Sequence, residues 1–172
     1  MKLTISKEVF NTFHPEFTVV FLLVEKINNH LHLSESRHLL QEVEQEIRNT
    51  HHPETIKNHY LISPWVAAQQ AFGKEAKHYQ TIVEHHLHTV LKGKSIATKD
   101  TLTNLLRYLS LKYLVPIGGD DADKLRGNIT FSIAKGKEKV NFLHHLLRGA
   151  LYYKDGQQVL GTKLDYWKNT QT

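Results

Sequence analysis

The sequence predicts an α+β protein in which a mixed or antiparallel sheet packs against helices. Three observations predict this class: an apolar, β-branched run at residues 17–24, helical patterns between residues 35 and 115, and alternating apolar positions after residue 128. The 172 residues contain no internal repeat and no linker-like tract, so we expect a single domain over residues 1–172.

The N-terminal part predicts two strands and a short helix. Residues 3–6 alternate weakly and indicate a strand, whereas residues 8–13 indicate a helix. Residues 17–24, FTVVFLLV, give the strongest strand prediction in the chain. Because this run is apolar on both faces, we expect it at the centre of the sheet.

A long helix is expected over residues 35–49, with Ser34 as its N-cap. Its predicted apolar stripe is Leu39, Leu40, Val43 and Ile47. Its predicted solvent-facing side chains are Glu42, Glu44, Glu46 and Arg48. Residues 51–60 are expected to form a loop or a frayed turn.

Three more helices are expected before residue 116. Ser63-Pro64 marks the start of the first, and Gly73 marks its end. The second runs from about residue 78 to residue 91 and carries His86 on its apolar face. Asp100 is the predicted cap of the third, whose predicted apolar stripe is Leu102, Leu105, Leu106, Leu109 and Tyr113.

The pattern changes to strands after Gly118-Gly119. Residues 128–134 alternate and predict a strand, and residues 140–147 are ambiguous between strand and helix. Residues 151–153 and 159–164 predict a hairpin around Asp155-Gly156.

Composition excludes several classes of protein. The chain has no cysteine, which excludes disulfides, thiolate metal sites and a cysteine nucleophile. Its N-terminus lacks a signal-peptide pattern, and the longest apolar run, residues 19–24, is far shorter than a membrane span. We therefore expect a soluble, cytoplasmic protein without a membrane partner.

Basic residues are concentrated in the C-terminal part. Residues 124–172 hold nine Lys or Arg and three acids, a net charge of +6, whereas residues 1–123 carry −1. This surplus has two interpretations, a surface for a phosphate backbone or a solvated basic face. The aromatic side chains among these basic residues suit either base stacking or hairpin packing; they are Tyr152, Tyr153, Tyr166 and Trp167.

No metal or cofactor is expected. Among 13 histidines, His85 and His88 have helical spacing for a shared metal, but no acid on their face completes the set. Asp120, Asp121 and Asp123 suit either a divalent cation or a turn in which aspartate caps the next segment. Ser110 lies in a helix without a nucleophile elbow, and the chain has no glycine-rich nucleotide loop.

Several blocks of sequence resemble one known family. They are residues 65–73, residues 79–94, the block YLSLKYLVPIGGDDADKLRG at residues 108–127, and AKGKE at residues 134–138. Together, residues 61–172 resemble the tRNA-editing domain (modules B-three and B-four) of the phenylalanyl-tRNA synthetase β subunit. They are most similar to the freestanding proteins that consist of this domain alone.

The resemblance implies an α+β domain with a mixed sheet and a pocket for the aminoacyl end of a tRNA. It also implies trans-acting hydrolysis of a wrongly attached amino acid. By position, the family's Pro-x-His-Ala corner falls on residues 116–119, with Gly118 in place of histidine, and its helical threonine falls on Leu106. The synthetase editing residues are therefore not retained, and the family's glutamate strand is expected beyond residue 172.

A pocket is expected between the predicted helix at residues 101–115 and the corner at residues 116–121. Its predicted lining is Ser110, Lys112, Pro116, Gly118, Gly119, Asp120 and Asp121. The residues expected to bind tRNA are Arg107, Lys124, Arg126, Lys135, Lys137 and Arg148. Backbone N–H groups of Gly118 and Gly119 are expected to donate to the ester carbonyl.

Two other hypotheses stay open. The first is a non-catalytic descendant that binds an amino acid, a small ligand or a protein partner. The second is a dimer that closes an open sheet edge, so the oligomeric state is not predicted.

Overall fold

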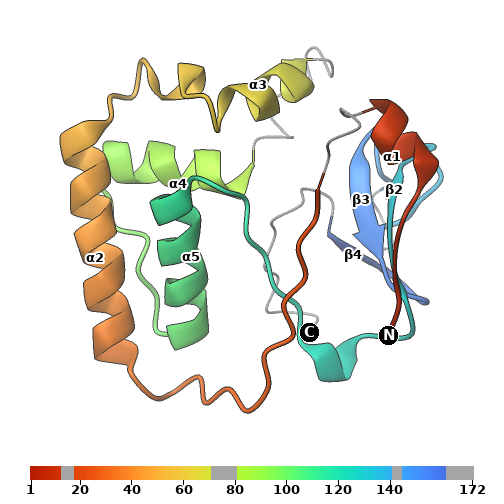
Figure 1. Ribbon diagram of the computed structural model, residues 1–172, viewed down its shortest axis with the longest axis horizontal. Helices are drawn as coiled ribbons and strands as arrows, with labels where there is room; N and C mark the ends of the chain where they lie inside the picture. Colours follow the sequence, from red (N-terminus) through yellow and green to blue (C-terminus); the bar gives the residue numbers. More distant parts are fainter. Residues whose placement is uncertain (13–17, 71–80, 141–144, 162–172) are drawn as a thin grey trace. The chain divides into compact units, whose positions relative to one another are not determined.

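The computed structural model describes residues 1–12, 18–70, 81–140 and 145–161, and the chain divides into two compact units (Figure 1). Residues Met1–Leu22 and Gly118–Thr172 form one, here called the sheet unit, and Leu23–Ile117 form the other, the helical unit. The predicted α+β class is confirmed, because helices and a mixed sheet are both present.

The described residues of the sheet unit form four strands in the order β1-β2-β3-β4. They are β1 (Leu3–Ile5), β2 (Ile129–Ile133), β3 (Leu151–Lys154) and β4 (Val159–Gly161). β1 pairs with β2 in parallel, and the other two pairings are antiparallel. A short helix, α1 (Lys7–Thr12), follows β1, and a 3-10 helix (Ala122–Lys124) precedes β2.

The core of the sheet unit lies on one face of these strands. Ile129 and Phe131 alternate inward from β2, as the period of a half-buried strand requires. Val9 of α1 packs against them, together with Leu151 and Tyr153 of β3. The predicted strands at 3–6, 128–134 and 151–153 are thus confirmed within one residue or two, while residues 162–164 of the predicted hairpin lie outside the described ones.

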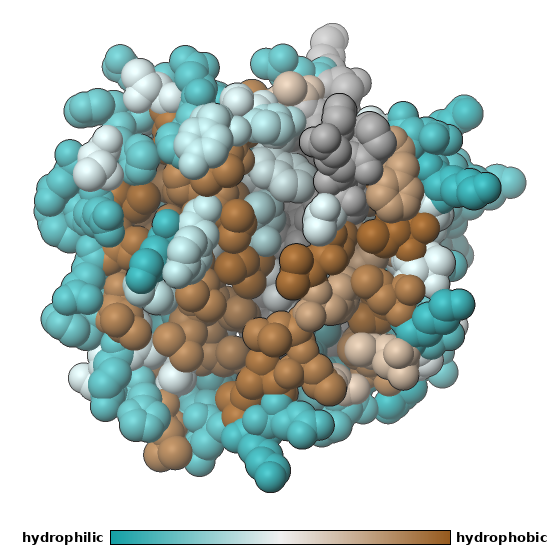
Figure 2. Space-filling model, in the orientation of Figure 1, coloured by the Kyte–Doolittle hydropathy of each residue, from teal (hydrophilic) through white to brown (hydrophobic). Residues whose placement is uncertain are grey.

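The predicted central strand at residues 17–24 is wrong for residues 18–24, which join no strand of the described sheet. Val19 packs against the sheet-unit core, and the ring of Phe21 meets that of Phe131 edge-on, with centroids 5.9 Å apart. Val20 and Leu22 point the other way and are 86% and 84% exposed. Apolar groups are accordingly open to solvent on the face seen in Figure 2.

The helical unit, over its described residues, is built from four α-helices and a 3-10 turn (Figure 1). They are α2 (Leu33–Thr50), the 3-10 helix Ile56–Asn58, α3 (Ser63–Gln70), α4 (Ile82–Leu91) and α5 (Thr101–Tyr113). Their core is Leu40, Val43, Ile47, Ile56, Ile62, Val83, Leu87, Val90, Ile96, Leu111 and Leu114. No helix in the described ranges is both long and apolar enough to cross a bilayer.

Two details of α2 differ from the sequence prediction. The helix begins at Leu33, after His32 in a left-handed conformation, so Ser34 is not its N-cap. Glu44, predicted to face solvent, is buried and accepts hydrogen bonds from Ile96 N at 2.8 Å and Ser95 Oγ at 3.0 Å. The carboxylate thereby accepts hydrogen bonds from the donors of a loop that lies distant in the sequence. An amphipathic pattern does not reveal such a contact.

Side chains cap α4 and α5. Thr81 caps α4 by accepting Glu84 N at 3.3 Å, so this helix begins at Ile82, and residues 78–80 lie outside the described part of the chain. Asp100 caps α5 by accepting Thr103 N at 2.6 Å, which confirms the predicted cap.

The predicted apolar face of α5 is wrong. Leu109 and Tyr113 are 37% and 55% exposed, whereas Asn104 and Leu111 are buried. Asn104 accepts from Thr98 N at 2.8 Å and donates to Ser36 Oγ at 3.3 Å, and so joins α5 to α2 and to the loop before the helix. A satisfied amide therefore takes the core position that leucines were expected to fill.

Candidate functional site

Asp120, in the corner after Gly118-Gly119, is hydrogen bonded to the sheet. Tyr153 on β3 donates from Oη to Asp120 Oδ2 at 3.0 Å. The Tyr153 ring stacks on Phe131 with centroids 5.1 Å apart, and Gly161 on β4 lies so close that an added Cβ would be 2.2 Å from Tyr153 Cε1. The phenol is therefore held in a fixed position, and it fixes the carboxyl group.

The protonation of Asp120 is shifted toward the neutral form. Burial raises the pKa of Asp120, the Tyr153 hydrogen bond lowers it, and the charge of Asp155 raises it, leaving it above its ordinary value. Oδ1 of Asp120 has no hydrogen-bond partner within the described residues. A half-buried carboxyl group of this kind is suited to exchange a proton with water.

The rest of the corner is fixed by carboxylates. Asp121 accepts Asp123 N at 3.1 Å and caps the 3-10 helix, in agreement with the turn interpretation of this acid run. Asp155 Oδ2 accepts Arg126 N at 2.9 Å, and Gly156 N donates to Arg126 O at 2.6 Å. Within the ranges described, no three histidine or acidic side chains are grouped so as to hold a metal.

A basic loop follows β2. The Glu138 carboxylate accepts Lys135 N at 2.9 Å and Lys137 N at 3.0 Å and closes the turn at Gly136, whose φ is 86°. Burial raises the pKa of Glu138, but these backbone donors outweigh burial and hold the pKa below its usual value. Backbone N–H groups thus bind the Glu138 carboxylate, while the lysine side chains are exposed to solvent.

A second chain segment lies against this loop. Gly149 N donates to Ala134 O at 2.8 Å, and Leu146 N donates to Glu138 O at 2.8 Å. A Cβ at Gly136 would lie 3.7 Å from Arg148 Cβ. We call the four exposed cations of these two segments the basic loop patch; they are Lys135, Lys137, Lys139 and Arg148.

The predicted pocket residues divide between the two units, whose boundary lies at Ile117 and Gly118. In the helical unit, Ser110 is buried and donates from Oγ to Val115 O at 2.7 Å. Lys112 is exposed, and its Nζ donates to Tyr108 Oη at 2.7 Å. Ser110 therefore stabilises the end of α5 and is not presented as a nucleophile.

The remaining predicted pocket residues belong to the corner itself. Pro116, the last of them in the helical unit, is half-buried. In the sheet unit, Gly118 is exposed, and Gly119 is half-buried beside Asp120 and Asp121.

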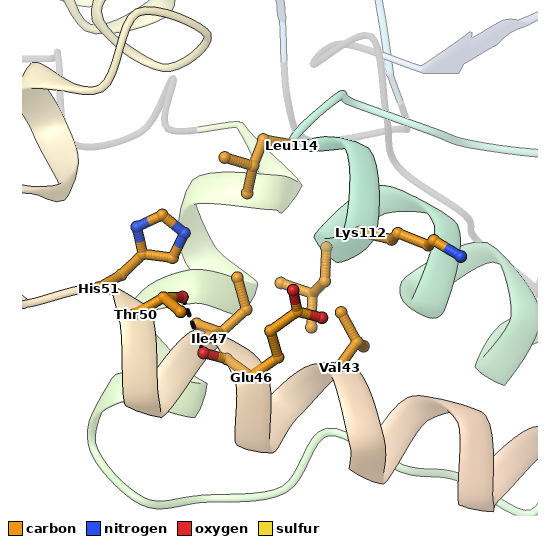
Figure 3. Close-up of a pocket in the computed structure, with 8 residues that line it drawn as sticks. Val43, Glu46, Ile47, Thr50, His51, Lys112 and Leu114 are labelled. Atoms are coloured by element: carbon orange, nitrogen blue, oxygen red, sulfur yellow. Dashed lines mark hydrogen bonds between the residues drawn. The ribbon is translucent and has the colours of Figure 1, made fainter.

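An open hollow with a cavity volume of about 70 Å³ lies between the C-terminal ends of α2 and α5 (Figure 3). Its lining is Val43, Glu46, Ile47, Thr50, His51, Leu111, Lys112 and Leu114. The Glu46 carboxylate points into it, whereas the Lys112 ammonium extends away. Thr50 Oγ1 donates to the backbone carbonyl of Glu46 at 2.7 Å, so this hydroxyl is engaged by its own helix.

Arg107, predicted to bind tRNA, is half-buried in the helical unit and donates from Nη1 to Ile96 O. His86 is 6% exposed, and its Nδ1 has no hydrogen-bond partner in the part of the chain described. Burial, followed by the charges of Arg107 and His85, lowers the pKa of His86 to about 3. His86 is therefore a neutral core residue, as the sequence indicated.

An acidic side chain, Glu84, lies close to one of the histidines of α4. The sequence placed no acid on the face of His85 and His88, but Glu84 Oε1 lies 3.9 Å from His88 Nε2. Glu84 is buried at the start of α4, where its backbone N–H meets the Thr81 cap. This contact joins two side chains only, and no third histidine or acid among the described residues completes a metal-binding group with them. The contact therefore does not indicate a metal.

Neither a protein-family model, nor a curated protein, nor a solved structure matches the chain. The resemblance to the synthetase editing domain therefore rests on the sequence blocks quoted above.

Sequence reasoning missed two features of the site. It considered Asp120 as a pocket residue and as a cation ligand or turn residue, but not as a group that exchanges protons, because the Tyr153 partner is 33 residues away. It also did not single out Glu138, although an acid directly after Lys-Gly-Lys is a signal for a turn closed by a side chain.

Proposed function

We propose that this chain is a cytoplasmic tRNA-binding protein of the editing-domain type that hydrolyses a mischarged aminoacyl-tRNA in trans. The observation that carries the proposal is the basic loop patch, whose four exposed cations suit a phosphate backbone. The sequence blocks in residues 61–172 support tRNA as the polyanion.

Hydrolysis of an aminoacyl ester requires a positioned water and a group that accepts its proton. In the proposed reaction, the Asp120 carboxylate takes a proton from water as the oxygen attacks the ester carbonyl. The proton then passes to the ribose oxygen as the C–O bond breaks, which releases the amino acid and the tRNA hydroxyl. The Tyr153 hydrogen bond, 3.0 Å long, supports this role because it fixes the carboxyl group.

A deacylation panel tests the proposal. Purified chain is mixed with a set of mischarged tRNAs, and binding of uncharged tRNA is measured at low salt. We expect turnover of at least one substrate, and we expect Asp120→Asn to lose turnover while tRNA binding is kept. If all substrates stay intact and tRNA does not bind at low salt, the proposal fails.

A second candidate is a non-catalytic descendant that binds an amino acid, a small ligand or a protein. Two sequence positions favour it, since Gly118 and Leu106 replace the histidine and threonine of the synthetase pocket. The engaged hydroxyl of Ser110 favours it as well. It predicts thermal stabilisation by a ligand without turnover, and strong turnover that is abolished by changes at Gly118 or Lys112 would exclude it.

A further inference from the structure

The described basic residues beside β2 and β3 lie at two opposite ends of these strands. In the antiparallel register, Thr130 opposes Lys154 and Ile133 opposes Leu151. Arg126 precedes β2 and so lies at the Lys154 end, whereas Lys135 and Arg148 lie at the other end. The ends of a five-residue strand are about 13 Å apart, so the two groups are separate surfaces.

The Lys154 end is neutralised by acids. Lys124 Nζ lies 4.0 Å from Asp121 Oδ2, and the Arg126 guanidinium is held near these acids by donating to the backbone carbonyl of Asp123 at 3.0 Å. Residues 120–126, Lys154 and Asp155 hold three cations and four carboxyl groups; the cations are Lys124, Arg126 and Lys154, and the acids are Asp120, Asp121, Asp123 and Asp155. Lys2, whose backbone bonds to Asn128 and Ile129, adds a fourth cation, so the charges at this end balance. This end therefore offers no net attraction to a polyanion.

The basic loop patch is different. Residues 134–150 contain four cations and one acid, Glu138, for a net charge of +3. Backbone N–H groups of Lys135 and Lys137 occupy the Glu138 carboxylate, so it does not pair with a patch side chain in the described residues. The hydrogen bonds between residues 134–139 and 145–150 bring the four cations together on two adjoining segments.

We infer that the phosphate backbone of a tRNA contacts the sheet unit at the basic loop patch, and that Lys124 and Arg126 at the opposite end do not contribute. This inference rests on the proposed function for the identity of the polyanion. It divides the residues predicted from sequence into a binding group and a structural group. Long, exposed lysines near one another are the side chains that release counterions from a phosphate chain.

Three double variants of the full chain test the inference. They are Lys135→Glu with Lys137→Glu, Lys124→Glu with Arg126→Glu, and Lys92→Glu with Lys94→Glu. All three cause the same change in net charge, and the last pair is exposed in the helical unit with the same two-residue spacing. Binding of uncharged tRNA is measured between about 0.05 and 0.2 M salt, and thermal melting confirms that each variant is folded.

The patch variant is expected to bind tRNA about tenfold or more weakly, and its salt dependence is expected to fall by about two counterions. The other two variants are expected to bind within about twofold of the wild type. Equal losses in all three variants, or a larger loss for the Lys124 and Arg126 pair, would overturn the inference.

Two further outcomes separate the inference from the proposed function. If the folded wild type does not bind tRNA even at about 0.05 M salt, the proposed function fails and the inference fails with it. If the patch variant keeps full tRNA affinity but loses binding to anionic phospholipid vesicles, the patch serves a lipid surface, and the inference alone is overturned.

Discussion

Tyr153 Oη donates to Asp120 Oδ2 at 3.0 Å and thereby ties the glycine corner to the β3–β4 hairpin. Burial, the larger effect, raises the pKa of Asp120, and this hydrogen bond lowers it. The corner is therefore held by a carboxyl group whose pKa is set by its burial, by this phenol and by the charge of Asp155.

Replacing Tyr153 with phenylalanine should raise the pKa of Asp120 further, because the lowering bond is lost and burial is kept. The carboxyl carbon of Asp120, followed by NMR through a pH titration, gives the measurement. Tyr152→Phe is the matched control, since neighbouring strand residues point to opposite faces. A lower or unchanged Asp120 pKa in Tyr153→Phe would contradict this account of the corner.

Glu44→Ala should destabilise the helical unit by about 2–4 kcal/mol, because Ile96 N and Ser95 Oγ lose their acceptor in a buried place. Glu44→Gln keeps an acceptor oxygen and should cost less. Urea unfolding followed by helical circular dichroism measures both. Glu42→Ala, on the exposed face of α2, is the control and should stay within about 0.5 kcal/mol of wild type, and an equal effect at both positions would refute the prediction.

Acidification should destabilise the helical unit through His86. Its folded-state pKa of about 3 is below the ordinary 6.5, so the unfolded chain binds a proton more readily. The free energy of unfolding therefore falls as pH drops below 6.5, by about 2 kcal/mol between pH 7 and pH 5, and the loss continues toward pH 3.

Thermal melts of His86→Leu compared with wild type across this pH range measure the effect. The variant should lose that part of the pH dependence, whereas His38→Leu, at an exposed site on α2, should follow the wild type. Parallel pH curves for His86→Leu and wild type would show that the buried imidazole does not control acid stability.

Gly161→Ala should destabilise the sheet unit by about 1–3 kcal/mol, because the new methyl group would lie 2.2 Å from Tyr153 Cε1 and displace the ring. Denaturation of the purified variant measures the loss. Gln157→Ala, exposed in the same hairpin, should be nearly neutral. A Gly161→Ala protein as stable as Gln157→Ala would mean that the ring moves without cost.

The parts of the fold that local chemistry determines were predictable from sequence. Asp100 precedes a helical pattern, and its side chain satisfies Thr103 N, so the helix start follows from residues close together in the chain. The turn at Asp121 follows in the same way from a run of aspartates that comes directly after two glycines. The β2 strand was predictable because its alternation has a single buried face.

The failures share another cause, which is selection by distant partners. Asn104 and Glu44 are polar, but both are buried, because the loop before α5 supplies their hydrogen bonds. That loop is distant in sequence from Glu44 on α2. A pattern based on polarity therefore predicted the wrong buried face for α5 and predicted that Glu44 faces solvent. Likewise, residues 18–24 have the composition of a strand, and no local signal shows that they lack a strand partner in the described sheet.

Part of the candidate site could also be predicted from the sequence. The motif blocks indicated the corner and the basic residues, but not which cations are engaged by acids. The closeness of Asp121 and Lys124 was visible in the sequence. Asp155, which accepts the backbone N–H of Arg126, lies 29 residues further along the chain and was not. The register of β2 and β3 was needed to separate the two basic groups.

The outward-facing side chains of Val20 and Leu22 have a consequence for the protein at high concentration. They lie in TVVFLLV, seven uncharged residues without proline or glycine, which is the composition of a segment that stacks into cross-β fibrils. In a parallel, in-register stack, Glu25 would lie above Glu25 and Lys26 above Lys26, so the two charges that follow the run act as gatekeepers against stacking. Salt that screens this repulsion should therefore promote fibrils while leaving the folded units intact.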